Sequence, residues 1–107
     1  MAEYYSEPAF FDAWTRGVQL AGTQFFTVRK PIKTKHDLEP DFDMIESGMG
    51  YLSSGERLFL TAMYSFYNSH GAAILYGRPF TPGDIAAALD EPRLRIVADL
   101  TVSYTGW

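Results

Sequence analysis

The fold is decided by residues 58–76, LFLTAMYSFYNSHGAAILY, which contain no Asp, Glu, Lys or Arg. From Arg57 through Thr61 to Asn68, polar residues follow one another at helical steps of three or four, so on a helix they form one narrow stripe. The positions around that stripe are almost all apolar. A helix of this kind is buried by other helices, by a partner chain or by lipid. We therefore predict a central helix at about residues 55–76.

A helix start signal precedes this stretch and a helix stop signal follows it. Ser53 and Glu56 have the spacing of a capping box, in which each side chain bonds a backbone N–H of the first turn. After the stretch come a glycine, a cation and a proline at residues 77–79, which together end a helix. The length would allow a membrane span, but polar residues from Thr61 to His70 interrupt it, so we expect no membrane association.

A second strongly patterned helix is predicted at about residues 7–29. Ser6 and Pro8 provide a capping residue and a first-turn proline, and Pro31 lies beyond the end. Apolar residues recur at steps of three and four along one face of this helix. Residues 23–28 are rich in β-favouring side chains, so the last third of the segment also has strand character.

The remaining segments are shorter. An acidic block at residues 37–46 contains a short helix starting near Pro40, and another short helix starts at Thr81 and ends before Pro92. Residues 94–104 fit both a helix and a strand. Two observations favour the helix. Pro92 suits the first turn of a helix, and a strand there would find a partner only in residues 23–29 or in a second copy of the chain.

These elements predict an all-α (mostly α) fold, a single compact domain over residues 1–107 with about four or five helices. The helix at 7–29 is expected to be the main packing partner of the central helix. The expected core consists of Phe11, Trp14, Val18, Phe25, Leu58, Phe59, Ala62, Met63, Phe66, Tyr67, Ile74 and Leu89.

Composition excludes several classes of function. The chain has 13 acidic and 9 basic residues, a net charge of −4, which disfavours direct nucleic-acid binding. It has no cysteine, so disulfides, thiolate metal sites and cysteine nucleophiles are excluded. The first residues lack the cationic and apolar regions of a secretory signal, so we expect a cytoplasmic protein.

The aromatic content is high, with 8 Phe, 7 Tyr and 2 Trp. Such rings can fill the core of one chain, or several of them can lie in an interface, where aromatic residues are enriched. Two helices this apolar carry more apolar surface than one chain of 107 residues is expected to bury. We therefore predict a homodimer or contact with a partner protein.

His70 is the most conspicuous candidate for chemistry. A histidine titrates near neutrality, so His70 could act as a general base or pH-sensitive contact in a pocket with Tyr64 and Tyr67. No nucleophile elbow accompanies it, and an ordinary helix histidine is the favoured interpretation. No catalytic residue is assigned.

The acidic block gives a second candidate site at Asp37, Glu39, Asp41 and Asp43. Spaced carboxylates can imitate a phosphate backbone and bind a basic partner, but acids also favour a helix N-terminus without any such role, and we prefer that simpler interpretation. His36 beside these acids lacks the spacing of an EF-hand or a zinc site. Phosphate-binding glycine loops are also missing, so no metal or cofactor is expected.

Three functional classes remain. The leading hypothesis is a non-enzymatic protein-binding module, a small acidic regulator or inhibitor that acts through protein–protein contacts. A small oligomeric enzyme or ligand-binding protein with a pocket near His70 is the first alternative, and a structural subunit of a larger assembly is the second.

Overall fold

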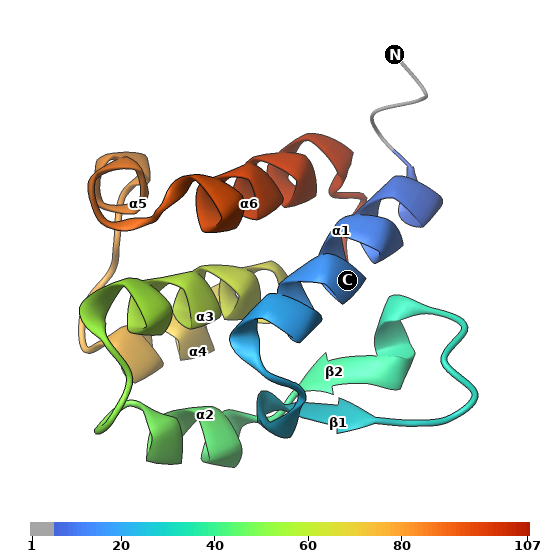
Figure 1. Cartoon of the computed structure of the whole chain (residues 1–107), viewed down its shortest axis with the longest axis horizontal. Coiled ribbons are helices and arrows are strands. Elements are labelled where there is room, and N and C mark those ends of the chain that lie inside the picture. The colour runs from blue at the N-terminus through green and yellow to red at the C-terminus, as the bar shows by residue number, and fades with distance from the viewer. Residues whose placement is uncertain (1–5) are drawn as a thin grey trace.

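A computed structural model of the chain describes residues 6–107 and shows a mostly α-helical domain with one small sheet (Figure 1), which confirms the predicted fold class. Two short 3₁₀ turns, at Thr23–Phe25 and Lys35–Asp37, adjoin the strands. In chain order, the helices and strands are α1 (Glu7–Ala21), β1 (Phe26–Val28), β2 (Leu38–Pro40), α2 (Phe42–Gly48), α3 (Ser54–Tyr67), α4 (Ser69–Tyr76), α5 (Pro82–Ala88) and α6 (Glu91–Ser103).

The prediction of one central helix over residues 55–76 is wrong in one respect, because the segment forms two helices, α3 and α4. The chain becomes extended at Asn68 (φ −156°, ψ 99°), and the Asn68 side chain accepts the Gly71 N–H at 2.9 Å. Asparagine side chains compete in this way for backbone donors and start new helices. The two helices then lie against each other (Figure 1) and form the most extensive contact between elements.

The first helix is shorter than the predicted span of 7–29. It ends at Ala21 because Gly22 adopts φ 115°, a conformation that glycine tolerates and other residues avoid. Of residues 23–28, for which strand character was expected, the first three form a 3₁₀ turn and only the last three form a strand, β1. Residues 94–103 lie in α6 and Tyr104 follows as its extended C-cap residue, so the helix preferred for residues 94–104 is confirmed for all but the last of them.

The sequence did not reveal the partner of β1. β1 and β2 pair in antiparallel fashion, with Phe26 opposite Pro40 and Val28 opposite Leu38. This small hairpin lies beside α1 and away from α5 (Figure 1). α6 runs along α1 on the other side, and α1 and α6 share a large contact.

Most of the predicted core is buried. Phe11, Phe66 and Tyr67 are only partly buried at the edge of that core. Ile74 is 57% exposed, so its assignment to the core is wrong: α4 faces inward with Ala72 and Leu75. The correctly predicted buried residues are Trp14, Val18, Phe25, Leu58, Phe59, Ala62, Met63 and Leu89.

Aromatic rings fill much of this core. Trp14 lies 4.9 Å from Trp107 and 5.9 Å from Phe10, measured between ring centroids, and Tyr67 lies 5.2 Å from Trp107. Of the aromatic residues within 6–107, Tyr51 alone is largely exposed, at 70%. The aromatic content therefore finds its packing partners mainly within one chain, and the homodimer stays a prediction. None of the helices in this described part of the chain has the length and hydropathy needed to cross a bilayer.

Candidate functional site

Two of the four predicted acidic site residues accept hydrogen bonds from nearby backbone N–H groups. The Asp37 carboxylate accepts the N–H groups of Lys33 at 2.9 Å and Thr34 at 3.0 Å, and these hydrogen bonds lower the pKa of Asp37. Asp41 caps α2 by accepting the Met44 N–H at 3.2 Å. Both carboxylates therefore have a structural use in the loop and at the start of α2.

The other two acids have different contacts. Glu39 Oε1 lies 2.8 Å from Arg29 Nη1, an ion pair across the hairpin. Asp43 is exposed in the first turn of α2, where the helix dipole favours an acid. The acidic block is thus divided among capping, pairing and solvent exposure, and its binding to a basic partner stays a prediction.

Tyr64 and Tyr67 lie together in the structure, whereas His70 is exposed to solvent. Tyr64 is buried and packs edge-to-face with Tyr67 at 5.5 Å. Burial raises the pKa of the Tyr64 hydroxyl, and the neighbouring Tyr67 raises it further. His70 is exposed in the first turn of α4. None of these three residues lines the larger hollows among the described residues, so the pocket proposed near His70 has no support from the geometry.

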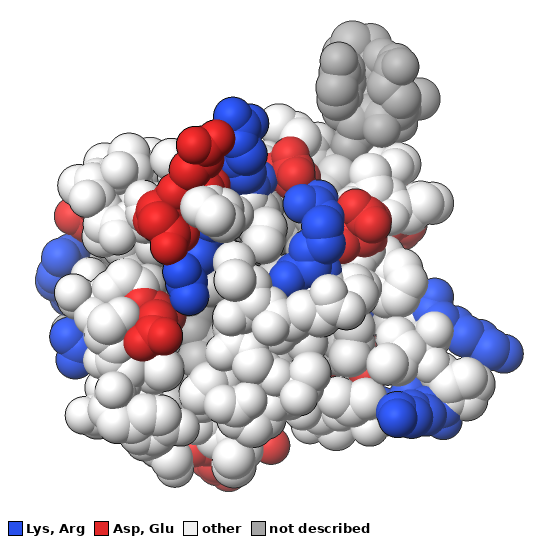
Figure 2. All heavy atoms as spheres, in the orientation of Figure 1, with Lys and Arg blue, Asp and Glu red and all other residues white. Residues whose placement is uncertain are grey.

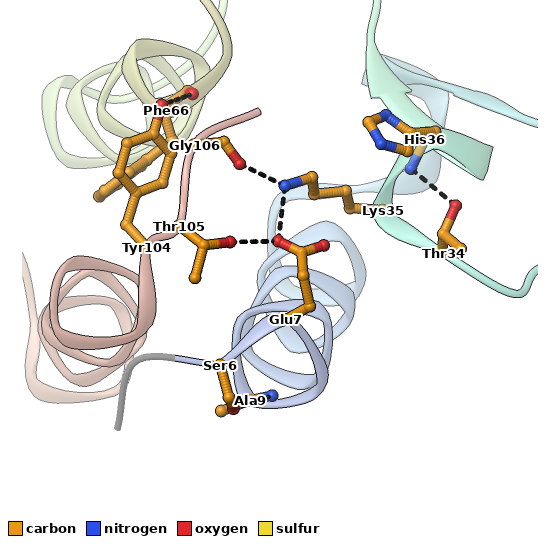
Figure 3. Close-up of polar contacts among 10 residues, drawn as sticks. All are labelled: Ser6, Glu7, Ala9, Thr34, Lys35, His36, Phe66, Tyr104, Thr105 and Gly106. Atoms are coloured by element: carbon orange, nitrogen blue, oxygen red, sulfur yellow. Dashed lines mark hydrogen bonds and ion pairs between the residues drawn. The ribbon is translucent and has the colours of Figure 1, made fainter. Parts of the chain in front are cut away.

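A buried cation that the sequence analysis missed lies elsewhere, at Lys35. Its side chain is 2% exposed, and Nζ donates to Glu7 Oε1 at 2.8 Å and to the Gly106 carbonyl (Figure 3). Nζ also lies 5.2 Å from the ring centroids of both Phe10 and Trp107. In the sequence Lys35 belongs to a basic run that is typical of a solvated loop, which hid this role.

Glu7 completes the contacts around Lys35. Thr105 Oγ1 donates to the same Glu7 oxygen that receives Lys35 (Figure 3), and both hydrogen bonds lower the pKa of Glu7. We call Glu7, Lys35, Thr105 and Gly106 the lysine clasp. The clasp joins the start of α1, the 3₁₀ turn before β2 and the residues after α6. With its ammonium group enclosed by these partners, Lys35 acts as a structural cation.

An apolar hollow between α1 and the hairpin is the better candidate for a binding surface. Its volume is about 420 Å³. Val28 and Ile32 are 39% and 41% exposed there, an unusual exposure for two β-branched aliphatic side chains at one site. We call this hollow the edge groove, and it is lined by Thr15, Val18, Gln19, Thr23, Val28, Lys30, Ile32 and Leu38.

The backbone of β1 borders the edge groove with unpaired groups. Arg29 N–H donates to the Asp37 carbonyl and Asp41 N–H to the Phe25 carbonyl, each at 2.9 Å, so the odd-numbered residues of this strand face β2. Because pairing alternates along an antiparallel ladder, the N–H and C=O of Val28 point away from β2. The outer edge of β2 is different, since the Leu38 carbonyl accepts Trp14 Nε1 at 2.8 Å. Only the β1 edge of the described hairpin therefore offers such groups beside an apolar hollow.

Basic side chains lie at the end of the edge groove. Lys30 lines the groove and Lys33 follows in the loop, and within residues 6–107 no carboxylate forms an ion pair with either ammonium. Figure 2 shows basic side chains projecting at the lower right, over the loop between the strands. The acidic protein thus has a locally basic rim here.

Comparison of the chain with protein-family models, with curated proteins and with solved structures gave no match. Within the described residues, no three His, Asp or Glu side chains are placed to share a metal ion. The interpretation of the edge groove accordingly comes from its own geometry. The β-rich stretch 23–28 and the basic run after it were visible in the sequence, but their position beside α1 was not.

Proposed function

We propose that this protein is a non-enzymatic protein-binding module whose edge groove receives an extended segment of a partner protein. The observation that carries the proposal is the unpaired edge of β1 beside an exposed apolar hollow. An exposed strand edge is a template for pairing with another chain, and many peptide-binding domains use one in this way.

The strand geometry determines where the side chains of such a segment would go. Phe26 and Val28 project to the same face of β1 because side chains alternate along a strand, and Phe26 is buried against Trp14 with ring centroids 5.9 Å apart. An added strand would place every second side chain on that face, toward the groove that Val28 and Ile32 line. Apolar side chains at these alternate positions would cover the exposed aliphatic surface.

The basic rim specifies the other positions of the segment. Lys30 and Lys33 are exposed and without ion-pair partners among the described residues, so acidic side chains next to them would gain favourable electrostatic contacts. The partner segment that fits best is therefore extended and alternates apolar with acidic residues. By binding such a segment, the module would work as a small regulator or inhibitor of a larger protein.

A proline substitution tests strand addition directly. Val28→Pro removes an N–H that points away from β2, so it costs no hydrogen bond of the hairpin. The probe is a short, capped, fluorescent peptide that alternates valine and glutamate. We expect Val28→Pro to weaken its binding by about tenfold or more, the scale of one or two lost hydrogen bonds, while thermal unfolding stays cooperative.

Val28→Thr is the matched control, because it keeps the N–H and the branched side chain, and it should bind nearly as well as the natural chain. A second probe with lysine in place of glutamate should bind more weakly, because it meets the basic rim with like charge. Equal binding of the glutamate peptide by the folded Val28→Pro variant would contradict strand addition. Absence of peptide binding to the natural chain would contradict the proposed function.

A further inference from the structure

A second hollow lies on another part of the molecule, where the end of α2, the start of α3 and the end of α4 meet. It has a volume of about 370 Å³ and shares no lining residue with the edge groove. We call it the arginine hollow, and it is lined by Met49, Arg57, Leu75, Tyr76, Gly77 and Arg78. The lining contains two cations and no acid, although the protein as a whole is acidic.

Arg57 contributes one of the two guanidinium groups of the arginine hollow. Within residues 6–107 no carboxylate forms an ion pair with its side chain, which is exposed near the start of α3. The N-terminal end of a helix carries partial positive charge, so the charge of Arg57 adds to the helix dipole instead of being compensated by it. Figure 2 shows basic side chains close together at the left edge, where this part of α3 lies.

Arg78 is held in place by three contacts. Its Nη1 lies 2.9 Å from the Pro79 carbonyl and 3.2 Å from Asp84 Oδ2, and its guanidinium carbon lies 5.1 Å from the Tyr76 ring centroid. Both of these polar contacts use Nη1, one nitrogen of a group that has five N–H donors. Arg78 is thus oriented by its neighbours and keeps donors for a ligand.

Part of the lining is apolar. Met49, Leu75 and the Tyr76 ring belong to the hollow together with the two arginines. Guanidinium groups bind carboxylate and phosphate oxygens with paired N–H donors, and apolar walls accommodate a hydrocarbon body. We infer that the arginine hollow binds a small anion in which a carboxylate or phosphate is attached to an apolar ring.

Simple probes can test this inference without knowledge of the natural ligand. Benzoate and phenyl phosphate carry the two anionic groups on the same ring, and benzamide is a neutral control of similar shape. Titration of the isotope-labelled full chain, followed by NMR, should shift signals around Arg57, Tyr76 and Gly77 with either anion. The anion that binds more tightly identifies the preferred group, and added salt should weaken the binding.

A substitution at Arg57 tests whether binding depends on the arginine hollow. Arg57→Gln should raise the dissociation constant by about tenfold, because a charge-assisted hydrogen bond is lost from an otherwise intact surface. Arg95→Gln on α6 is the matched control: Arg95 is also exposed, but it pairs with Glu91 at 2.8 Å and is outside the hollow. This variant should bind both anions as the natural chain does.

Three results would overturn the inference: no binding of either anion, equal binding of benzamide, or unchanged affinity in a folded Arg57→Gln variant. Because the two hollows share no lining residue, none of these results affects the proposal for the edge groove. Likewise, Val28→Pro should leave the binding of benzoate and phenyl phosphate unchanged.

Discussion

Lys35 shows how one residue can differ from the role its sequence context indicates. Burying an ammonium group is costly unless opposite charge and hydrogen bonds compensate for it. Here the compensation comes from Glu7, from the Gly106 carbonyl and from the faces of Phe10 and Trp107. These partners come from distant parts of the chain, so no local pattern around Lys35 could predict the lysine clasp.

The first prediction at this scale concerns the two contributions of Lys35, charge and packing. Lys35→Ala removes the ion pair, both contacts with rings and the buried hydrocarbon chain, and should lower the free energy of unfolding by about 2–4 kcal/mol. Lys35→Met keeps the hydrocarbon packing and should recover at least half of that loss. Chemical denaturation of the two variants measures the difference, and a loss below about 0.5 kcal/mol for Lys35→Ala would contradict the structural role.

At the scale of elements, the sequence predicted helices better than their interruptions. Capping residues and first-turn prolines correctly indicated the starts of α1, α2, α3 and α5, because these signals are local. The periodicity of α6 fitted both helix and strand, and its early proline favoured the helix that the structure shows. The break at Asn68 was missed because its flanking residues continue the apolar pattern of one helix. The strand β2 was missed because it is three residues long, Leu-Glu-Pro, and exists only through its pairing with β1.

The helix break leads to the second prediction. Asn68→Ala removes the side-chain oxygen that accepts the Gly71 N–H, and should lower the free energy of unfolding by about 1 kcal/mol, as for other N-caps. Asn68→Asp keeps an acceptor and should be nearly neutral. Since Asn68 is exposed, the change creates no cavity that would obscure the result. An Asn68→Ala variant that is more stable and more helical by circular dichroism would show that the cap does not maintain the break.

For the candidate site, the sequence supplied acidic residues whose individual contacts it could not predict. Two acids of the predicted acidic surface, Asp37 and Asp41, are backbone caps, so charge reversal at these positions would disturb folding along with any binding. Asp43→Lys is the cleaner test of an acidic contact surface, because Asp43 is exposed. The edge groove could not be recognised from the sequence, since its lining comes from α1, the 3₁₀ turn after it, both strands and the loop between them.

At the scale of the whole molecule, the two proposed sites belong to different parts of the fold. The edge groove depends on α1 and the hairpin, whereas the arginine hollow depends on α2, α3 and α4. The helical core holds these elements in fixed positions, with Trp14 and Phe25 buried next to the hairpin. The chain could therefore bind a protein segment and a small anion separately, and a variant at one site should not alter the other.

Backbone amide hydrogen exchange at β1, measured by NMR with and without the valine–glutamate probe, tests the central claim most directly. In the free chain the Thr27 and Arg29 amides should exchange slowly because they face β2, while the Val28 amide should exchange fast. Saturating probe should slow the exchange of Val28 and leave its neighbours nearly unchanged. A Val28 amide that is already protected in the free chain, or that stays fast when the probe is bound, would contradict the account.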